Sequence, residues 1–379
     1  KADQIIDAAD KIVIPGLIDT HTHVAMAHLK GRLDDIELGE FLDRTFELDV
    51  KRTDEGIYNS SKLAIYEMID SGITSFLDLY YSEDIIAKAA RDTGIRSFLS
   101  WVTLDKEFTT QNGDPVSNAE TFIKEWQGKD LVTPSVGIQG IYVTSDETYT
   151  RVKEISEKYD TLIHTHLAET RKEIYDLVKK IGERPIEHLD KIGFLNDRLI
   201  AAHCVWVTAH EVKILASHGV NVSWNSVSNF KLGTGGVPPI PEMMQSGLNI
   251  TLGTDSNGSN NSLNLFEEMK FSPLTIKNQR WDASFIKAQE ALDFATRNAG
   301  IALRSPIGSI EQGKKADIVI IDGRKPGMMP VSDETAVSNI VYSANPSCVD
   351  TVLINGKILK EDGKLLNYKP DQFRNAVFI

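Results

Sequence analysis

Cysteine is scarce in this sequence. Only Cys204 and Cys348 occur among 379 residues, and they lie far apart along the chain. Two distant cysteines cannot build a disulfide framework or a cysteine-based zinc knuckle. Such sparse use of cysteine is typical of a reducing compartment, and we therefore expect a cytoplasmic protein.

Basic residues are also in deficit. Lys and Arg number 41 against 54 Asp and Glu, which gives a net charge of −13. Nucleic acids and anionic membranes are bound by patches of Lys and Arg that neutralise phosphates. The sequence has no run of the roughly 18 uncharged apolar residues that a membrane-spanning helix needs. We expect a small-molecule partner, no nucleic acid and no membrane, and the sequence leaves a homo-oligomer open. Because the chain opens with Lys1 rather than Met, we also expect that a short N-terminal piece is missing.

Short runs rich in β-branched residues recur along the chain and predict eight strands. They cover residues 12–19, 73–80, 96–104, 132–143, 162–167, 199–207, 220–226 and 248–254. Segments with apolar residues at helical spacing lie between them, at residues 53–71, 83–94, 146–159, 172–181 and 209–219. Eight strands alternating with helices predict an α/β fold, a (β/α)8 TIM-like barrel.

The pattern of the sequence changes after Gly308, where short strand-like runs replace the alternation of strand and helix segments. Short alternating runs surround Asn355-Gly356, which is a hairpin signal. With Lys1 to Asp10 as an edge strand, both chain ends are predicted to form one small composite β-sandwich domain. We expect residues 1–12 and 311–379 to form this domain and residues 13–310 to form the catalytic barrel.

The first candidate site residues are His21 and His23, at the end of the first predicted strand. Residues i and i+2 of a strand point to the same face, so both imidazoles can reach one metal ion at a barrel mouth. Taken alone, the pair is equally well explained as two polar residues at a strand end.

The fifth predicted strand ends in a second cluster, with His166 at its tip and Glu169 three residues later. This spacing places a metal ligand beside a proton carrier and suits metal-assisted hydrolysis. His164 shares the face of His166 but lies one layer deeper. We assign His164 to packing.

Two further strands end in candidate residues, His203 after the sixth and Asp255 after the eighth. Each is unremarkable alone, since an Asp at a strand end commonly caps the next helix. Together, polar residues close strands one, five, six and eight at the C-terminal face, where barrel enzymes keep their chemistry.

These residues resemble the amidohydrolase superfamily, in its branch of methylthioadenosine/S-adenosylhomocysteine deaminases and triazine chlorohydrolases. The resemblance covers nearly the whole chain. Its motifs are residues 15–23 (PGLIDTHTH), 166–170 (HLAET), 202–205 (AHCV), 228–233 (SNFKLG), 252–256 (LGTDS) and 260–269 (NNSLNLFEEM).

The resemblance implies a barrel that holds one divalent metal ion, with zinc as the first choice and iron as the alternative. The implied ligands are His21, His23, His166 and Asp255. Residues 136–143 contain no Lys, whereas relatives with two metals carry a carboxylated Lys there. The resemblance also gives three catalytic roles: Asp255 orients the attacking water, Glu169 carries its proton to a ring nitrogen, and His203 holds the attacking oxygen.

The chain departs from its adenosine-type relatives around the expected substrate. These relatives carry a His after strand four and an Arg after strand three, where this chain has residues 137–142 (GIQGIY) and Trp101. Trp101 offers a flat apolar face, and Gln139 or Tyr142 can supply hydrogen bonds. With Glu169 and His203, these three are the predicted substrate contacts, and they favour an uncharged aminated heterocycle.

The leading hypothesis is thus a mononuclear metal-dependent amidohydrolase that deaminates an amino-substituted nitrogen heterocycle, an adenosine-like nucleoside or a nucleobase, with release of ammonia. The alternative is hydrolytic removal of chloride or an alkylamine from a triazine-like ring. A hypothesis of a different class is a non-catalytic barrel that serves as a scaffold. The presence of the complete ligand set argues against the scaffold.

Overall fold

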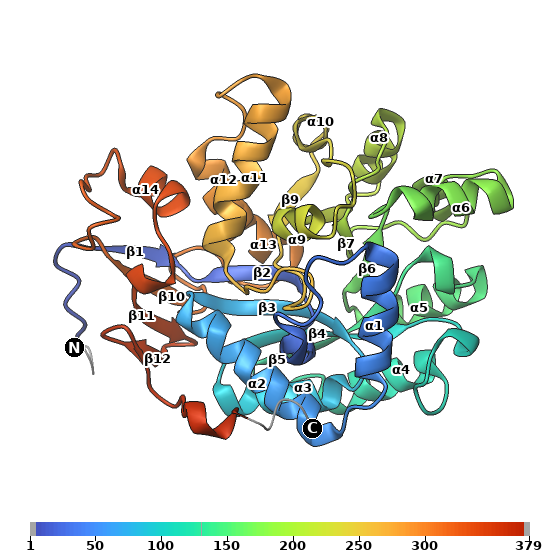
Figure 1. The fold of residues 1–379 in the computed structure, drawn as a ribbon, viewed down its shortest axis with the longest axis horizontal. Coiled ribbons are helices and arrows are strands. Elements are labelled where there is room, and N and C mark those ends of the chain that lie inside the picture. Colours follow the sequence, from blue (N-terminus) through green and yellow to red (C-terminus); the bar gives the residue numbers. More distant parts are fainter. Residues whose placement is uncertain (1–4, 130, 375–379) are drawn as a thin grey trace.

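The computed structural model describes residues 5–129 and 131–374. Its centre is a sheet of eight parallel strands in sequential order (Figure 1). The strands are β2 (Leu17–Thr22), β3 (Ile73–Tyr80), β4 (Arg96–Thr103), β5 (Val132–Ile138), β6 (Ile163–Leu167), β7 (Leu199–His203), β8 (Asn221–Trp224) and β9 (Asn249–Leu252). The first and last strands approach each other through a single bridge between Thr22 and Asp255. The predicted (β/α)8 barrel is confirmed.

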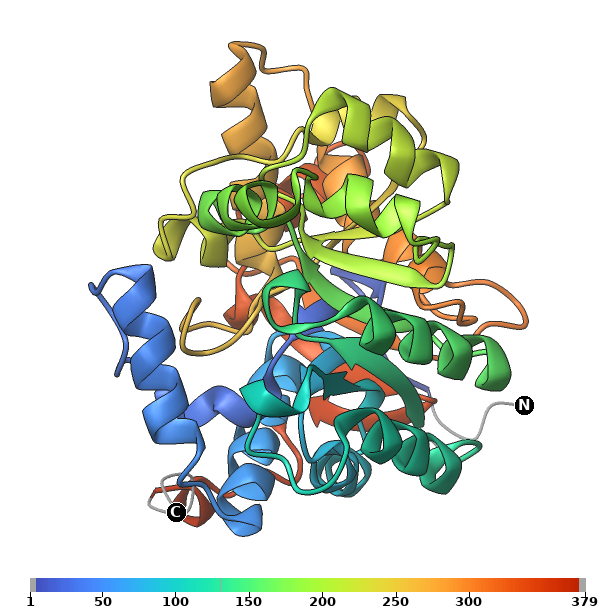
Figure 2. The ribbon, with the colours of Figure 1, turned by 90° about the vertical axis from the view of Figure 1, so that its right-hand side faces the viewer.

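Helices surround these strands. In the turned view of Figure 2, helices of the blue and teal segments lie below the strands and those of the green to orange segments lie above. The long helices are α1 (Leu38–Asp49), α2 (Asp54–Asp70), α3 (Glu83–Thr93), α4 (Pro115–Trp126), α5 (Asp146–Tyr159), α6 (Arg171–Ile181), α8 (Ala209–Ser217) and α11 (Leu265–Arg280). The short ones are α7 (Pro185–Lys191), α9 (Ser226–Lys231), α10 (Ile240–Gln245), α12 (Ala288–Phe294), α13 (Arg297–Ala302) and α14 (Ala336–Tyr342).

Apolar side chains fill one end of the barrel interior. Ile18, Leu77, Phe98 and Ile200 pack there with Leu303, which follows α13. The strands are almost entirely buried, so they contribute to both the inner and the outer apolar layer. Since this end is filled by hydrocarbon, polar chemistry is confined to the other end, where the strands finish.

A second sheet of five antiparallel strands lies beside the barrel (Figure 1). Its strands are β1 (Lys11–Pro15), β10 (Ile318–Asp322), β11 (Val349–Ile354), β12 (Lys357–Glu361) and β13 (Lys364–Leu365). The sheet combines both ends of the chain, as the predicted small β domain requires. The division into residues 1–12 and 311–379 against 13–310 stays a prediction.

The expected single strand over residues 12–19 is wrong, because the chain passes from one sheet to the other at Gly16. The Gly16 N–H donates to Asp317 O at 2.9 Å, whereas the next N–H, of Leu17, donates to Gly72 O at 3.1 Å in the barrel. A Cβ on Gly16 would lie 2.0 Å from Thr74 Oγ1. Only glycine allows this close passage between the two sheets.

The expected edge strand within Lys1 to Asp10 is also wrong for the described residues 5–10, which contain no strand. Residues 1–4 lie outside the described part of the chain. The edge is β1 instead, and its register pairs Lys11 with Asp322 and Pro15 with Ile318. These pairs use the whole length of β10, so no partner is left for the residues before Lys11.

Buried polar contacts fix the small sheet to the barrel. Arg96, at the start of β4, binds Asp317 through Nε at 2.7 Å and Nη2 at 3.0 Å. The Asp317 carboxylate also accepts the backbone N–H of Asn355 at 2.7 Å. A bidentate pair of this kind is specific in geometry. Because it lies where β4 begins, the small sheet docks at the end of the barrel opposite the strand tips.

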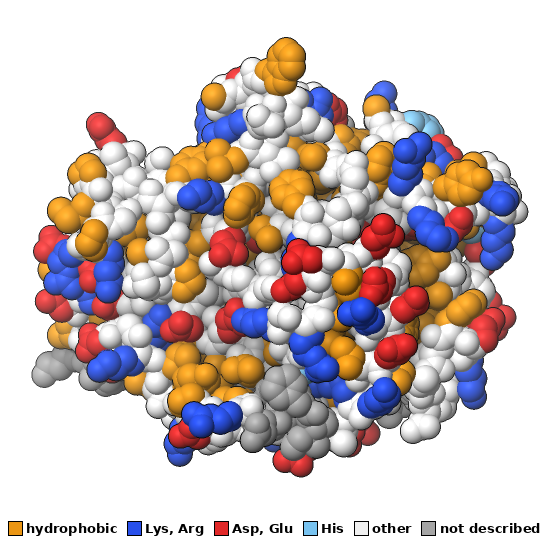
Figure 3. Space-filling model, viewed as in Figure 1, with side chains coloured by type: hydrophobic (Ala, Val, Ile, Leu, Met, Phe, Trp, Pro, Cys, Tyr) orange, Lys and Arg blue, Asp and Glu red, His pale blue; other side chains and the backbone are white. Residues whose placement is uncertain are grey.

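Within the described residues, no helix is long and apolar enough to cross a membrane. On the face drawn in Figure 3, acidic and basic side chains lie interspersed. The predicted cytoplasmic location and homo-oligomer stay predictions.

Candidate functional site

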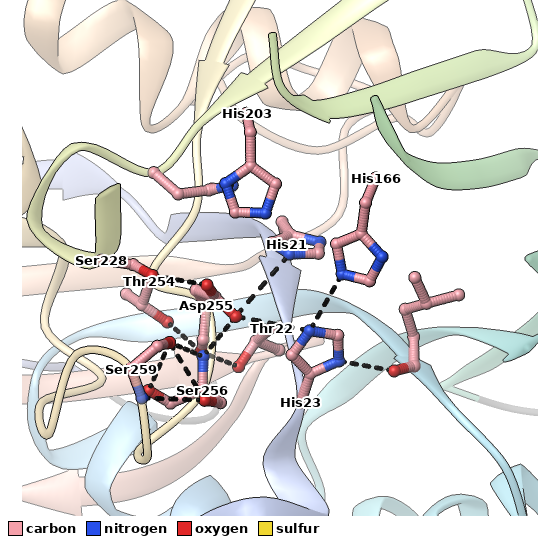
Figure 4. Close-up of polar contacts among 12 residues, drawn as sticks. His21, Thr22, His23, His166, His203, Ser228, Thr254, Asp255, Ser256 and Ser259 are labelled. Carbon is pink, nitrogen blue, oxygen red and sulfur yellow. Dashed lines mark hydrogen bonds and ion pairs between the residues drawn. The ribbon is translucent and has the colours of Figure 1, made fainter. Parts of the chain in front are cut away.

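Six of the residues predicted to form the site lie at the tips of the strands. His21 is on β2, His166 on β6 and His203 at the end of β7, and the chain brings His23 and Asp255 to them just beyond the ends of β2 and β9 (Figure 4). Glu169 follows the end of β6. The barrel thus gathers in one place residues that lie more than two hundred positions apart in the sequence.

Three histidines and one carboxylate converge on a common centre. His23 Nε2 lies 3.3 Å from His166 Nε2 and 3.3 Å from Asp255 Oδ1. His21 Nε2 lies 3.8 Å from the same carboxylate oxygen. The rings of His21 and His23 stand edge to face with centroids 4.9 Å apart. Nitrogen and oxygen atoms at such separations can surround one small cation.

Backbone carbonyl groups set the tautomers of two of these histidines. His23 Nδ1 lies 2.6 Å from Leu79 O, and His166 Nδ1 lies 2.7 Å from Gln139 O. A carbonyl oxygen only accepts, so each Nδ1 carries the hydrogen. Each Nε2 therefore turns a lone pair to the centre, which is the arrangement found in histidines that bind metals.

His21 reaches the same tautomer through His164. His21 Nδ1 lies 2.8 Å from His164 Nε2, and His164 Nδ1 lies 3.4 Å from Asp78 O. The carbonyl takes the His164 hydrogen, so His164 Nε2 accepts from His21. The sequence assigned His164 to packing, but the structure gives this buried ring a second function in orienting His21.

The donor set fits a divalent cation. His21 Nε2 is buried and has no hydrogen-bond partner among the described residues, and ligand atoms of His21, His23 and His166 lie within 4.8 Å of one another. An isolated buried nitrogen of this kind costs free energy unless something binds it. Burial lowers the pKa of His21 well below its ordinary value and that of His166 to about 3. Both rings are therefore neutral, as metal ligands must be.

Asp255 is held by its neighbours. Ser228, on α9, donates to Asp255 Oδ2 at 2.5 Å, which leaves Oδ1 for the centre. Burial opposes the charge of Asp255, but a protonated His23, through its hydrogen bond and charge, holds the pKa of this carboxyl well below its usual range, and a bound cation would take the place of that proton. The backbone of Asp255 has φ +61°, a strained conformation of the kind found at functional sites.

Glu169 and His203 stand beside the centre. The Glu169 carboxylate lies 3.9 Å from His203 Nε2. Burial raises the pKa of Glu169, His203 opposes the shift and Asp255 adds to it. A carboxyl group with a raised pKa is suited to take and return a proton near neutral pH.

The structure also shows how the Glu169 backbone is held. Glu173, in the first turn of α6, accepts the N–H groups of Ala168 and Glu169, each at 2.9 Å. The sequence analysis missed Glu173. The pattern Thr170-x-x-Glu173, a helix-start signature, was the signal that could have revealed it.

The predicted substrate contacts separate into two groups. Gln139 borders the cluster through its bond to His166, and its amide donates to Tyr142 OH at 3.3 Å. Trp101 is not brought to the cluster. Its ring packs on Phe122 of α4, with centroids 5.8 Å apart, and its N–H donates to Gln111 at 2.8 Å.

Strand alternation explains the position of Trp101. Phe98 belongs to the apolar cluster inside the barrel. Successive side chains of a strand alternate, so Trp101, three residues later, faces the helices. It lines a cavity of about 390 Å³ beside Tyr81 and Phe122.

The sequence profile of the Amidohydrolase family matches residues 12–359. The chain therefore belongs to the amidohydrolase family, and the resemblance noted from the sequence motifs is confirmed. The 5′-deoxyadenosine deaminase of Methanocaldococcus jannaschii is 40% identical over 367 residues, which cover 96% of this chain and 86% of that protein. The 5-methylthioadenosine/S-adenosylhomocysteine deaminase 1 of Archaeoglobus fulgidus is 39% identical over 364 residues, 96% of this chain and 86% of that protein.

Solved structures agree with this assignment. A zinc-bound adenosine deaminase from Xanthomonas campestris superposes with a TM-score of 0.93 and 30% identity, over 97% of this chain and 84% of that one. An atrazine chlorohydrolase from Arthrobacter aurescens, in complex with zinc, superposes with a TM-score of 0.88 over 98% of this chain and 89% of that one, but at 22% identity it shows only the shared fold. The chain is an amidohydrolase that acts on carbon–nitrogen bonds other than peptide bonds, and the scaffold hypothesis is set aside.

Proposed function

We propose that this chain deaminates the adenine-type ring of an uncharged, adenosine-like nucleoside. The observation that carries the proposal is the buried Nε2 of His21, which has no hydrogen-bond partner among the described residues and faces the His23, His166 and Asp255 ligand atoms. The Glu169 carboxylate lies beside them, near His203. Such a site combines a cation position with a proton carrier, and both are needed to replace an amino group by an oxygen.

The proposed metal ligands are His21, His23, His166 and Asp255, and the proposed ion is zinc. Three imidazoles and one carboxylate match the ligand types and number that zinc prefers. The zinc-bound adenosine deaminase structure supports this choice. When bound, a divalent cation lowers the pKa of a coordinated water to about 7.

The chain's own residues would then handle the protons. Asp255, oriented by Ser228, accepts a hydrogen bond from the attacking water. Glu169 takes a proton from that water and passes it to a ring nitrogen. The attacked carbon becomes tetrahedral. The proton that remains on the added oxygen then passes through Asp255 to the amino group, the carbon–oxygen double bond forms as the carbon–nitrogen bond breaks, and ammonia leaves. His203 donates a hydrogen bond to the attacking oxygen and keeps it in place.

The substrate proposal rests on the names of the relatives and on the positions at which this chain differs from adenosine-type relatives. Relatives of 37 to 40% identity carry the name 5′-deoxyadenosine deaminase, and that nucleoside has no charged group. Trp101 stands where the relatives that bind a carboxylate carry an Arg, so this chain lacks that charged partner for a substrate carboxylate. Gln139 and Tyr142, next to His166, would contact the ring or sugar.

The alternative substrate class is a chlorinated or alkylamino triazine. Its support is the fold shared with atrazine chlorohydrolase at 22% identity, which says nothing about the substrate. Deamination of a nucleoside is therefore the function that the observations favour.

A substrate panel with zinc-loaded enzyme tests the proposal. The panel contains 5′-deoxyadenosine, adenosine, 5′-methylthioadenosine, S-adenosylhomocysteine, adenine and an aminotriazine, with ammonia release as the readout and Glu169→Gln as the matched inactive control. We expect the highest kcat/KM for 5′-deoxyadenosine and a low value for S-adenosylhomocysteine. Lack of ammonia release from every member would refute the deaminase proposal.

A further inference from the structure

His203 is held differently from the other histidines of the cluster. The Nδ1 atoms of His23 and His166 face carbonyl oxygens, and that of His21 faces the acceptor nitrogen of His164. His203 Nδ1 instead faces two amide nitrogens, Asn229 Nδ2 at 2.9 Å and Asn225 Nδ2 at 3.3 Å.

An amide NH2 group only donates, so it determines which nitrogen of His203 carries the hydrogen. His203 Nδ1 must supply a lone pair to both asparagines, and the hydrogen of the neutral ring is then on Nε2. His203 is thus the opposite tautomer of the three other rings. Its Nε2–H points into the site, where Glu169 Oε1 lies 3.9 Å away.

The fold holds the Asn225 amide in this orientation, whereas the buried Oδ1 of Asn229 has no hydrogen-bond partner among the described residues and the Asn229 amide is oriented by its contact with His203. His203, Asn225 and Asn229 are each at most 2% exposed. The hydroxyl of Ser223 donates to Asn225 Oδ1 at 3.3 Å, which turns the amide nitrogen toward His203. A Cβ on Gly253 would lie 2.4 Å from the same Oδ1, so glycine at that position makes room for the Asn225 side chain.

We infer that Asn225 and Asn229 are positioning residues that keep His203 in the Nε2–H tautomer, so that His203 serves as a hydrogen-bond donor to the reacting oxygen and stays out of the metal ligand set. Ligand atoms of His21, His203 and Asp255 lie within 4.8 Å of one another, so distance alone would allow His203 to bind a metal. A metal ligand needs the Nε2 lone pair, and the two asparagines remove it. The donor role rests on the proposed function, whereas the tautomer itself does not.

The first test reads the tautomer directly. Long-range 1H–15N correlation spectra of protein labelled at histidine distinguish Nδ1–H from Nε2–H rings, and the His203 signals are assigned by their loss in His203→Gln. In metal-free wild-type protein we expect Nε2–H for His203. In zinc-loaded protein we expect the same tautomer, without a shift of His203 Nε2 to a metal-bound position. An Nδ1–H ring, or zinc coordination by His203, would overturn the inference.

The second test reverses the tautomer. The carboxylate of Asn229→Asp accepts only, so we expect His203 to carry its hydrogen on Nδ1. In a serine protease, the wrong tautomer of the catalytic histidine lowers kcat about 10⁴-fold. We expect a fall in kcat of about 10³–10⁴-fold with zinc content and KM nearly unchanged. Asn118→Asp, at a half-buried position of α4 outside the cluster, is the matched control and should behave as wild type.

The outcomes separate this inference from the proposed function. If no substrate releases ammonia but the spectra show the Nε2–H ring in wild type and the Nδ1–H ring in Asn229→Asp, the proposed reaction fails and the positioning role stands. If Asn229→Asp leaves the tautomer unchanged, the asparagines do not set it and the inference is wrong, whatever the activity.

Discussion

Glu173 accepts the backbone N–H of Glu169 at 2.9 Å, so one carboxylate holds the residue that presents another. The second oxygen of Glu173 takes the N–H of Ala168, whose φ of +51° marks a sharp turn out of β6. Two neighbouring N–H groups thus converge on one buried side chain. This arrangement fixes the backbone from which the Glu169 carboxylate reaches the candidate metal centre.

Replacement of Glu173 by Gln should disturb catalysis without loss of metal. Gln has one acceptor oxygen for two N–H donors, so one buried donor loses its partner and the turn relaxes. A small misplacement of a catalytic group can cost about 10²-fold in rate. We expect kcat to fall by about that factor, with zinc content and KM retained. Glu290→Gln is the matched control, because Glu290 accepts the Lys287 N–H at 2.7 Å at the start of α12, in a half-buried position. Equal kinetics for the two variants would refute the positioning role.

Removal of one proposed metal ligand should release the ion. His166→Ala or Asp255→Ala leaves three ligands, which hold a zinc ion poorly and no longer activate its water. We expect zinc content, measured by mass spectrometry of the purified protein, to drop together with activity. His218→Ala, whose ring follows α8 and contacts Asp190 of α7 at 2.7 Å, should keep full zinc content. Full occupancy in both ligand variants would show that the ligand set is wrong.

Glu169→Gln should separate proton transfer from metal binding. Gln keeps the shape of Glu but cannot carry a proton, so zinc should remain while kcat falls by about 10²–10⁴-fold. A steady-state assay and a zinc measurement on the same preparation check both expectations. Near-normal turnover would remove Glu169 from the mechanism.

Much of the fold could be predicted because hydrophobic periodicity determines it locally. The strand Ile73–Tyr80 and the helix Asp146–Tyr159 begin and end where the pattern predicts. The extension of the fourth barrel strand to residue 143 was wrong, since β5 ends at Ile138 and Gly140 adopts a φ of +155°. Apolar residues at positions 141 and 143 continue the pattern, but glycine at 140 turns the chain into a short helix, Ile141–Val143.

The candidate site could be predicted only where residues of the right type stand at strand tips. His21, His23 and Asp255 meet this rule, and the barrel brings them together. The residues that support the site were not predicted, because Asn225, Asn229 and Ser228 act through contacts that no single segment of sequence reveals. Trp101 illustrates the reverse case. Its residue type predicted a contact with the substrate, but strand alternation directs its ring toward α4.

His164→Leu tests whether this histidine only packs. Leu fills much of the same space but cannot accept the His21 Nδ1–H, so His21 loses its partner at 2.8 Å. Loss of a hydrogen bond that orients a metal ligand typically lowers metal affinity or activity by about 10–100-fold. We expect the zinc dissociation constant, measured by competition with a chelator, to rise by about this factor, and the free energy of unfolding of the metal-free protein to fall by about 1–3 kcal/mol because the buried His21 Nδ1–H is left unpaired. Unchanged zinc affinity would return His164 to a packing role.

Glu268 should make the stability of the fold depend on pH. This buried carboxyl accepts the Ser226 N–H at 2.9 Å, the Ser226 hydroxyl at 2.7 Å and the Asn260 amide at 3.1 Å. Burial raises the pKa of Glu268 from 4.5 to about 8, against the effect of these hydrogen bonds. Between these two pH values the folded protein holds a proton that the unfolded chain releases. The free energy of unfolding therefore falls as pH rises through this window, by at most about 1.4 kcal/mol per pH unit for one group.

Glu268→Gln removes this titration. In the variant the hydrogen bonds from Ser226 and Asn260 are weaker at every pH. The variant should therefore be less stable than wild type at pH 5, where wild-type Glu268 is protonated. As pH rises to 8, wild type loses the contribution of the bound proton and the variant does not, so the difference in the free energy of unfolding should move in favour of the variant. Urea unfolding of zinc-loaded wild type and variant at pH 5, 6, 7 and 8 measures this difference. If the difference in the free energy of unfolding is the same at all four pH values, Glu268 does not titrate in this window and is not the source of the pH dependence.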